Sequence, residues 1–250
     1  MRKNTFYKIY RRLGGVRDIP RISHHFKVQE DVLYSILSQK IVRQTKKDFH
    51  VIARQSERMA REWESGKTLL KIADEREFPP VLTASFILKQ LGVSKKQYKA
   101  YLHDPGLIKN TRMRKEFEEV IDNDFIYSPQ GISAQKERGN FCEEQIQSWL
   151  DDVCISYMTE DDCRMAGKEK TPDFLFDCPQ VIGGITVNWC ESKGSFGSPY
   201  QMGYDFNNQL KHYVELFGPG MVSYWVGYVD EVSLGDEIAI VDRSFFIDTY

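Results

Sequence analysis

The chain has 250 residues and a formal net charge of −2, with 41% hydrophobic, 28% charged and 13% aromatic residues. This composition excludes a disordered chain and leaves room for one large or two small domains. No apolar run approaches the roughly 20 residues of a membrane span, and the first residues lack the apolar core of a signal peptide. We therefore expect an intracellular protein without membrane association, in the nucleus and cytoplasm if the source is eukaryotic and in the cytoplasm if it is prokaryotic.

Charge is distributed unevenly along the chain. Residues 1–128 contain 26 Lys and Arg against 16 Asp and Glu, whereas residues 129–250 contain 8 against 20. A basic segment of this kind is typical of a module that binds nucleic acid. Two oppositely charged surfaces that dock on each other would give the same pattern, so charge alone leaves both interpretations open.

The first half predicts helices throughout. Apolar residues recur at helical spacing in segments 19–26, 32–41, 49–63, 69–73, 81–91, 94–103 and 110–123. Thr68 and Ser94 stand where they can cap the helices that follow them, and Pro79-Pro80 ends one helix and begins the next. We expect a small helical domain.

Two short helices around the turn at Gly92, followed by a third helix, form a helix-turn-helix pattern. The pattern is also common in helical bundles that bind nothing, and the basic surplus is what favours nucleic acid. The polar residues that flank this turn are the ones expected nearest to phosphates: Lys89, Gln90, Lys95, Lys96 and Lys99.

Beyond a breaker-rich segment at 127–131 the sequence pattern changes, which predicts a domain boundary and two domains, 1–128 and 129–250. The second half predicts helices over 139–152 and 204–217 and strands over 153–158, 172–177, 185–193, 221–229 and 237–241. Gly183-Gly184 is suited to a two-residue hairpin turn. This order of elements predicts an α/β sandwich.

Three charged residues lie on two neighbouring predicted strands. Asp173 follows Thr171-Pro172, and Glu191 and Lys193 lie two residues apart, so that both side chains leave the same strand face. Carboxylates bind hard cations, and a lysine beside them can stabilise phosphate charge. Each residue alone is more often a surface group, but together with the intervening hairpin they predict a nuclease site.

Two further residues are candidates for the same site. Glu143 borders the apolar stripe of helix 139–152, where an acid is costly unless it is paired or bound to a cation. Gln209 lies on the apolar face of helix 204–217, near Tyr213. It is either a core amide with satisfied hydrogen bonds or a group that orients substrate or water, and the sequence does not decide between them.

With these residues in place, the chain resembles the PD-(D/E)xK nuclease superfamily, and more closely the codanin-interacting nuclease family, also called the TPD-motif family. The resembling stretches are PPVLTASFIL (79–88), HDP (103–105), NDFIYSP (123–129), KTPDF (170–174), WCESKGSFG (189–197) and QLKHYVELFGPG (209–220). They run in order over residues 68–230. The first sixty or so residues match only in their helical character.

The resemblance implies an α + α/β protein: a helical, helix-turn-helix-containing domain followed by a restriction-endonuclease-like core with a mixed central sheet. It implies divalent-metal chemistry with Asp173, Glu191 and Lys193 as signature residues, Glu143 as the acid of the first core helix and Gln209 in a QxxxY motif. The core type is also similar to archaeal Holliday-junction resolvases, which suggests branched DNA. A codanin-like partner is implied if the source is eukaryotic.

The resulting expectation is a nuclease in which Mg²⁺ or Mn²⁺ is held by Glu143, Asp173, Glu191 and the Cys190 carbonyl. The basic domain would supply much of the affinity for nucleic acid, and DNA is the expected substrate. The alternatives are a nuclease fold kept as a DNA-binding scaffold for a chromatin partner and an RNA-processing enzyme. The oligomeric state cannot be inferred from the sequence.

Overall fold

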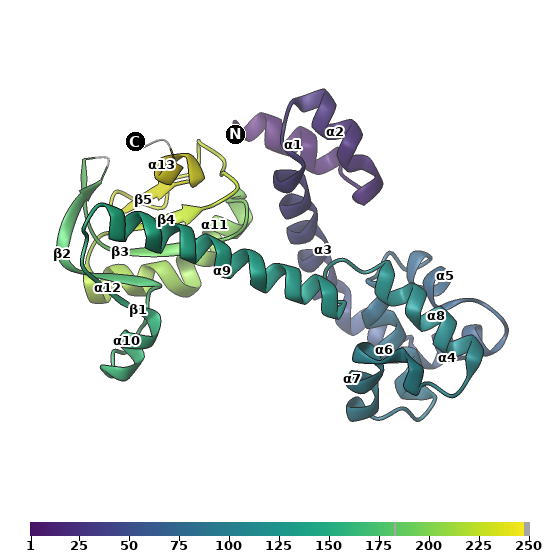
Figure 1. Ribbon diagram of the computed structural model, residues 1–250. Coiled ribbons are helices and arrows are strands. Elements are labelled where there is room, and N and C mark those ends of the chain that lie inside the picture. The colour runs from purple at the N-terminus through teal and green to yellow at the C-terminus, as the bar shows by residue number, and fades with distance from the viewer. Residues whose placement is uncertain (183, 248–250) are drawn as a thin grey trace. The chain divides into compact units, whose positions relative to one another are not determined.

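The computed structural model describes residues 1–182 and 184–247 (Figure 1). The chain divides into two compact units: unit 1 comprises Met1–Gln39 with Glu137–Tyr250, and unit 2 comprises Lys40–Lys136. This division differs from the predicted one at residues 128 and 129, because the first 39 residues group with the C-terminal half. Within the described residues, no helix has the length and apolarity needed to cross a bilayer.

Packing around Phe196 explains why the N-terminal segment belongs to unit 1. The segment forms α1 (Lys3–Arg12), η1 (Val16–Asp18), α2 (Ile19–Phe26) and the start of α3 (Glu30–Ala53). The Phe6 ring stacks on the Phe196 ring with centroids 6.0 Å apart. Ser35 Oγ accepts a 2.8 Å hydrogen bond from Phe196 N, and Gln39 Nε2 donates to the Phe196 carbonyl at 2.6 Å. Contacts between residues this far apart in sequence cannot be read from composition.

Unit 2 contains the helices predicted between residues 49 and 123, with one break that the pattern did not predict. Its helices are the second part of α3, α4 (Ser56–Glu64), α5 (Leu69–Asp74), α6 (Pro80–Gln90), α7 (Lys95–His103), η2 (Pro105–Leu107), α8 (Thr111–Asp122) and the first turns of α9 (Pro129–Asp152). The predicted helix 49–63 is interrupted, since α3 ends at Ala53 and α4 begins at Ser56. Residues such as Trp63, Ile87 and Phe117 form its buried core.

The predicted helix caps of unit 2 are confirmed. Thr68 Oγ1 accepts a hydrogen bond from Lys71 N at 3.2 Å. Ser94 and Gln97 form a reciprocal capping box: Ser94 Oγ accepts from Gln97 N at 3.3 Å, and Gln97 Oε1 accepts from Ser94 N at 2.9 Å. These bonds satisfy amide groups that the first helical turn leaves without partners, so the start of α7 is fixed locally.

A five-stranded mixed sheet forms the centre of unit 1. Its strands are β1 (Tyr157–Thr159), β2 (Phe174–Ile182), β3 (Ile185–Lys193), β4 (Gly220–Tyr224) and β5 (Ile238–Val241), in that spatial order. The pairs β1–β2 and β2–β3 are antiparallel, and β3–β4 and β4–β5 are parallel, which confirms the mixed sheet. β2 and β3 pair out to Ile182 and Ile185, while Gly183 of the predicted hairpin turn lies outside the described residues.

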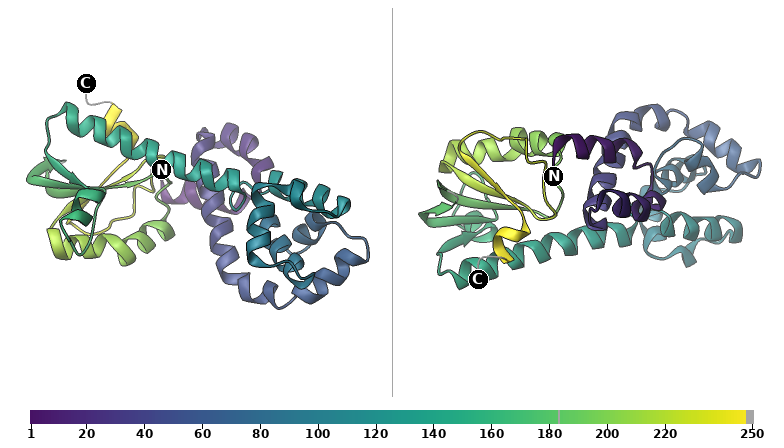
Figure 2. Two further views of the ribbon diagram at one scale, coloured as in Figure 1. Left: turned by 60° about the horizontal axis from the view of Figure 1, so that its bottom comes forward. Right: turned by 90° about the horizontal axis from the view of Figure 1, so that it is seen from above.

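Helices cover both faces of this sheet. Figure 2 shows α9 on one side, and α11 (Pro199–Asp205), η3 (Phe206–Leu210) and α12 (Lys211–Phe217) on the other. Two short helices, α10 (Glu160–Met165) and α13 (Arg243–Ile247), were not predicted. α9 begins at Pro129, ten residues before the predicted start at Gly139, so the breaker-rich segment opens a helix instead of a linker.

Gly220 allows β4 to approach the indole ring of Trp189. A Cβ at Gly220 would lie 1.9 Å from Trp189 Cε2, and the ring is held in place by a 2.9 Å hydrogen bond from its Nε1 to the Gly218 carbonyl. We predict that Gly220→Ala lowers the free energy of unfolding by about 1–3 kcal/mol, measured by urea denaturation.

The control is Gly203→Ala, since a Cβ there meets nothing within 4 Å and Gly203 lies inside α11. It should leave stability unchanged or raise it by up to about 1 kcal/mol. Equal urea midpoints for the two variants would contradict the close approach of β4 to Trp189.

Candidate active site

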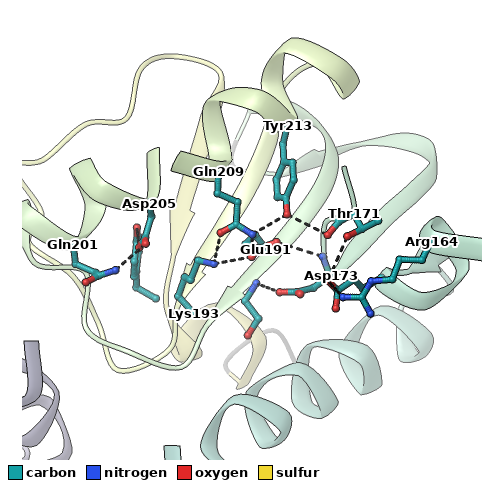
Figure 3. Close-up of polar contacts among 12 residues, drawn as sticks. Arg164, Thr171, Asp173, Glu191, Lys193, Gln201, Asp205, Gln209 and Tyr213 are labelled. Carbon is teal, nitrogen blue, oxygen red and sulfur yellow. Dashed lines mark hydrogen bonds and ion pairs between the residues drawn. The ribbon is translucent and has the colours of Figure 1, made fainter. Parts of the chain in front are cut away.

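The register of β2 and β3 brings Asp173 and Glu191 together. Phe174 pairs with Cys190, so Asp173, the residue before β2, lies across from Glu191. The Asp173 amide N is 3.4 Å from Glu191 Oε2, and Asp173 Oδ2 accepts a 2.7 Å hydrogen bond from the Ser192 amide (Figure 3). The hairpin therefore juxtaposes the two acids that the motif predicted.

Lys193 forms an ion pair with Glu191 on the same strand face. Its Nζ lies 2.7 Å from Glu191 Oε1, and the side chains of the lysine and the glutamate are 20% and 4% exposed. The same Nζ donates to Gln209 Oε1 at 2.7 Å. The cation is thus anchored beside both predicted acids, which is where a phosphate-stabilising group is needed.

Gln209 connects the strands to the covering helix. It lies in η3, a single π-helical turn, a conformation that occurs frequently at functional sites. Its Nε2 is 2.7 Å from Glu191 Oε1 and 2.8 Å from the Tyr213 hydroxyl. The Tyr213 hydroxyl in turn donates to the Thr171 carbonyl at 3.1 Å, which ties α12 to the segment that carries Asp173.

Glu143 lies at the margin of this network. Glu143 is exposed on α9, beside the buried residue Cys142. Partial burial raises the pKa of its carboxyl, and the negative charges of Glu191 and Glu160 raise it further. The structure therefore brings Glu143 within electrostatic range of the paired acids. Glu160, at the start of α10, is an additional nearby acid that the sequence analysis missed.

Cys190 lies between Trp189 and Glu191 in β3, and its side chain is on the opposite face of the strand from Glu191. Its thiol is fully buried, and burial raises the pKa of that thiol well above its ordinary value. Side chains alternate along a strand, so this thiol points away from the face that carries Glu191 and Lys193. The part of Cys190 that was predicted as a metal ligand is its main-chain carbonyl, and the buried thiol takes no part in that prediction.

Burial raises the pKa values of the two central acids. Burial, reinforced by the charge of Glu191, raises the pKa of Asp173 to about 8. Burial also raises the pKa of Glu191, although its bonds with Lys193 oppose the shift. Burial lowers the pKa of Lys193, but Glu191 outweighs it and the net shift is upward. The lysine therefore stays charged, while burial favours the protonated form of both carboxyls.

A buried acid next to Lys193 was not predicted. Asp205 accepts hydrogen bonds from Gln201 Nε2 at 2.8 Å and from the Tyr224 hydroxyl at 3.0 Å. Its negative charge contributes to the raised pKa of Lys193. A recognisable signal was present, because polar residues recur every fourth position from 201 to 213 along the covering helices. These side chains are labelled in Figure 3.

The five predicted phosphate-contacting residues all belong to unit 2. Lys89 and Gln90 end α6, and Lys95, Lys96 and Lys99 lie on α7; all five are exposed. Gln90 Nε2 donates to Ser56 Oγ at 2.8 Å. The helices around Gly92 are present as predicted, and their role in binding nucleic acid stays a prediction.

The donor chemistry of the site fits a hard divalent cation. Asp173 and Glu191 present adjacent carboxyl groups whose pKa values are raised chiefly by burial, and oxygen donors of this kind suit Mg²⁺ or Mn²⁺. Among the described residues, no group of three or more His, Cys, Asp or Glu side chains lies close enough to hold a metal. Asp173 and Glu191 are therefore the pair of carboxyl groups that could hold such an ion.

The raised pKa of Asp173 predicts how stability varies with pH. Its ordinary pKa is 3.8 and its folded pKa is about 8. Between these pH values the folded chain holds a proton that the unfolded chain has lost, so the free energy of unfolding should fall as pH rises from about 4 to about 8. Urea denaturation in EDTA across this range measures the slope, and Asp173→Asn should make it shallower. An unchanged slope in the variant would contradict the assigned shift.

Comparison with known proteins places the chain in a family. A family model described as "Protein of unknown function TPD sequence-motif" matches residues 109–244. The chain is similar to proteins named CDAN1-interacting nuclease 1. The Bos taurus protein is 30% identical over 185 residues, covering 71% of this chain and 66% of that protein, just under two thirds of its length.

Two other relatives of the same name align over more of the chain. The Xenopus laevis protein is 28% identical over 247 residues, covering 92% of this chain and 81% of that protein. The Gallus gallus protein is 27% identical over 266 residues, covering 98% of this chain and 93% of that protein. No solved structure matches. Because the family model covers more than half of the sequence and includes the whole Asp173–Lys193 hairpin, the chain belongs to the TPD sequence-motif family.

Proposed function

We propose that this protein is a divalent-metal-dependent nuclease of the PD-(D/E)xK type that hydrolyses phosphodiester bonds, and that it is a structure-selective DNA endonuclease. The observation that carries the proposal is the single network in which Asp173, Glu191 and Lys193 meet across the β2–β3 register. The name of these relatives, which includes the word nuclease, supports the reaction class. Repair, recombination or chromatin maintenance is the setting that such an activity would serve.

Asp173 and Glu191 would hold the cation, with Glu143 and the Cys190 carbonyl as further oxygen donors. When bound, the cation would lower the pKa of a water molecule and supply positive charge beside the scissile phosphate. Lys193, kept charged by Glu191, would donate to a phosphate oxygen as negative charge builds up on it. Substrate entry would require Lys193 to exchange its bond with Glu191 for one with phosphate.

Gln209 and Tyr213 would position these groups. The Gln209 amide bonds both members of the Glu191–Lys193 pair, and Tyr213 fixes that amide and the Thr171 carbonyl. A rigid donor array costs little reorganisation when charge develops in the transition state. Gln209 would therefore hold the glutamate and the lysine in place, or orient water, without itself exchanging protons.

The experiment is a substrate panel with the full chain. Single-stranded, duplex, flap and four-way-junction substrates, as DNA and as RNA, are incubated with Mg²⁺, Mn²⁺ or EDTA. We expect cleavage of DNA, strongest on a branched substrate, only when a divalent ion is present. A closed circular single strand tests endonuclease action, because an exonuclease cannot begin on it. No turnover on any substrate would refute the nuclease proposal.

A second candidate is a nuclease fold that binds DNA without cutting it. The observation in its favour is that Lys193 Nζ already bonds both Glu191 and Gln209, while the described residues contain no three-ligand metal cluster. It predicts DNA binding in the panel with no metal-dependent product. Preferential cleavage of RNA would instead favour the RNA-processing alternative.

We further propose a codanin-like protein partner, since the relatives are named for an interaction with CDAN1. We also propose an intracellular location, in the nucleus and cytoplasm if the source is eukaryotic and in the cytoplasm if it is prokaryotic. Purified partner and full chain should then form a complex by size-exclusion chromatography, and this binding should not require cleavage activity.

A further inference from the structure

A hollow in unit 2 combines aromatic walls with lysines. It has a volume of about 520 Å³ and lies between α3, α4, α6 and α7. This volume is within the range of small-ligand sites, roughly 300–1,000 Å³. Phe49 and Phe86 form one wall, with ring centroids 5.3 Å apart in an edge-to-face arrangement, and Phe49 is 38% exposed. A flat apolar group thus has aromatic surface to lie against.

The charged part of the lining is entirely positive. Lys89 and Lys95 line the hollow, and no Asp or Glu does. Among the residues that the structure describes, neither lysine forms an ion pair. α7 begins at Lys95, so the amide groups of its first turn are at the same rim and add partial positive charge. The lining therefore favours an anion.

The hollow also carries groups that can pair with a polar ring edge. Gln90 lines the hollow, and its Nε2 donates a hydrogen bond to Ser56 Oγ. This bond connects α6 to α4. This bond leaves the Gln90 amide oxygen available as an acceptor. Amide side chains are among the groups that hydrogen-bond the edges of nucleobases.

We propose that this hollow binds one nucleotide of a single-stranded segment of nucleic acid. The base lies against Phe49 and Phe86, and its phosphate faces Lys89 and Lys95. Aromatic stacking with neighbouring cations is the usual way in which proteins hold unpaired bases. The inference rests on the proposed function for the choice of nucleic acid as ligand, but it concerns a binding site in unit 2 that is separate from the proposed cleavage chemistry.

An acidic peptide with an aromatic side chain is the competing occupant. The aromatic wall, the cation pair and the amide acceptor together match a base joined to a phosphate more closely than a peptide, whose main chain would need several further hydrogen-bond partners. The choice between the two is an outcome of the test.

The test measures binding of fluorescent oligonucleotides to the full chain in EDTA, so that cleavage plays no part. The pocket variant is Lys89→Gln with Lys95→Gln. The matched control is Lys71→Gln with Lys109→Gln, which removes the same charge from exposed lysines of unit 2 that do not line the hollow. We expect about tenfold weaker binding for the pocket variant, with a log–log salt slope shallower by about 0.7 for the lost phosphate contact. The control should change little.

Base contact is tested separately with Phe49→Leu, which keeps an apolar group but removes the ring. The full chain should prefer a normal strand to an abasic strand of equal length by about tenfold, and the variant should lose most of that preference. Thermal unfolding by circular dichroism checks that each variant is folded. As an independent readout, a strand containing 5-iododeoxyuridine should cross-link to peptides of α3 or α6.

Three results would overturn the proposal. The first is an equal loss of oligonucleotide affinity in the pocket and control variants. The second is a preference for the normal over the abasic strand that Phe49→Leu leaves unchanged. The third is binding of an acidic tyrosine-containing peptide that depends on the pocket lysines while strand binding does not. The last result would make the hollow a peptide site. Absence of cleavage in the substrate panel would refute the nuclease proposal alone, because strand binding in EDTA is a separate measurement.

Discussion

Asp173→Asn is expected to lower the rate of metal-dependent cleavage by at least about 10²-fold, the usual cost of removing a group from a preorganised site. Asparagine keeps the shape and can still accept the 2.7 Å bond from the Ser192 amide. It removes the negative charge that a divalent ion needs beside Glu191. Single-turnover cleavage of the best substrate measures the effect, and binding of that substrate in EDTA should be largely intact.

Asp177→Asn is the matched control, since Asp177 is an exposed acid on the same strand that bonds Ser156 and not the site. It should cleave at the wild-type rate. Equal rates for Asp173→Asn and wild type would remove Asp173 from the chemistry, while an equal loss in both variants would point to a general effect on β2.

Glu191→Ala is expected to lower the free energy of unfolding by about 3 kcal/mol, because it leaves the ammonium of Lys193 without its partner in a site where the lysine is 20% exposed. The Gln209 amide loses one of its two acceptors at the same time and keeps the Tyr213 hydroxyl. Asp173 and Asp205 remain near the lysine, which keeps the loss at the lower end of the range for buried pairs. Urea denaturation in EDTA measures it.

Replacing both partners, Glu191→Gln with Lys193→Met, separates the lost charge pair from lost packing. The double variant should be close to wild type in stability, because neither charge is left unpaired and the volumes are similar. A single variant as stable as the double would mean that the ion pair does not govern the stability of this hairpin.

Features set by local chemistry could be predicted from the sequence. The caps at Thr68 and Ser94 and the position of Asp173 opposite Glu191 depend on neighbours or on strand register, and both are confirmed. The expected TPD-motif family is also confirmed, over residues 109–244. Placement in the larger PD-(D/E)xK superfamily and the metal site remain proposals.

Features set by packing between distant segments could not be predicted. The breaker-rich segment at 127–131 looks like a linker, but Pro129 suits a first helical turn and α9 continues from it to Asp152. Membership of the N-terminal helices in unit 1 depends on Phe6 and Phe196, 190 positions apart. Asp205 is a core acid satisfied by Tyr224 of another element, and no single segment shows that pairing.

The division of unit 1 into two stretches of sequence has a consequence for synthesis on the ribosome. Residues 1–39 emerge first, but their partners around Phe196 emerge about 150 residues later. Unit 2 is continuous from Lys40 to Lys136, so all its core contacts are available once that stretch has left the exit tunnel. Domains generally fold as units during translation. Unit 2 can therefore fold early. The apolar faces of the N-terminal helices stay exposed until the last strands of the sheet have been synthesised.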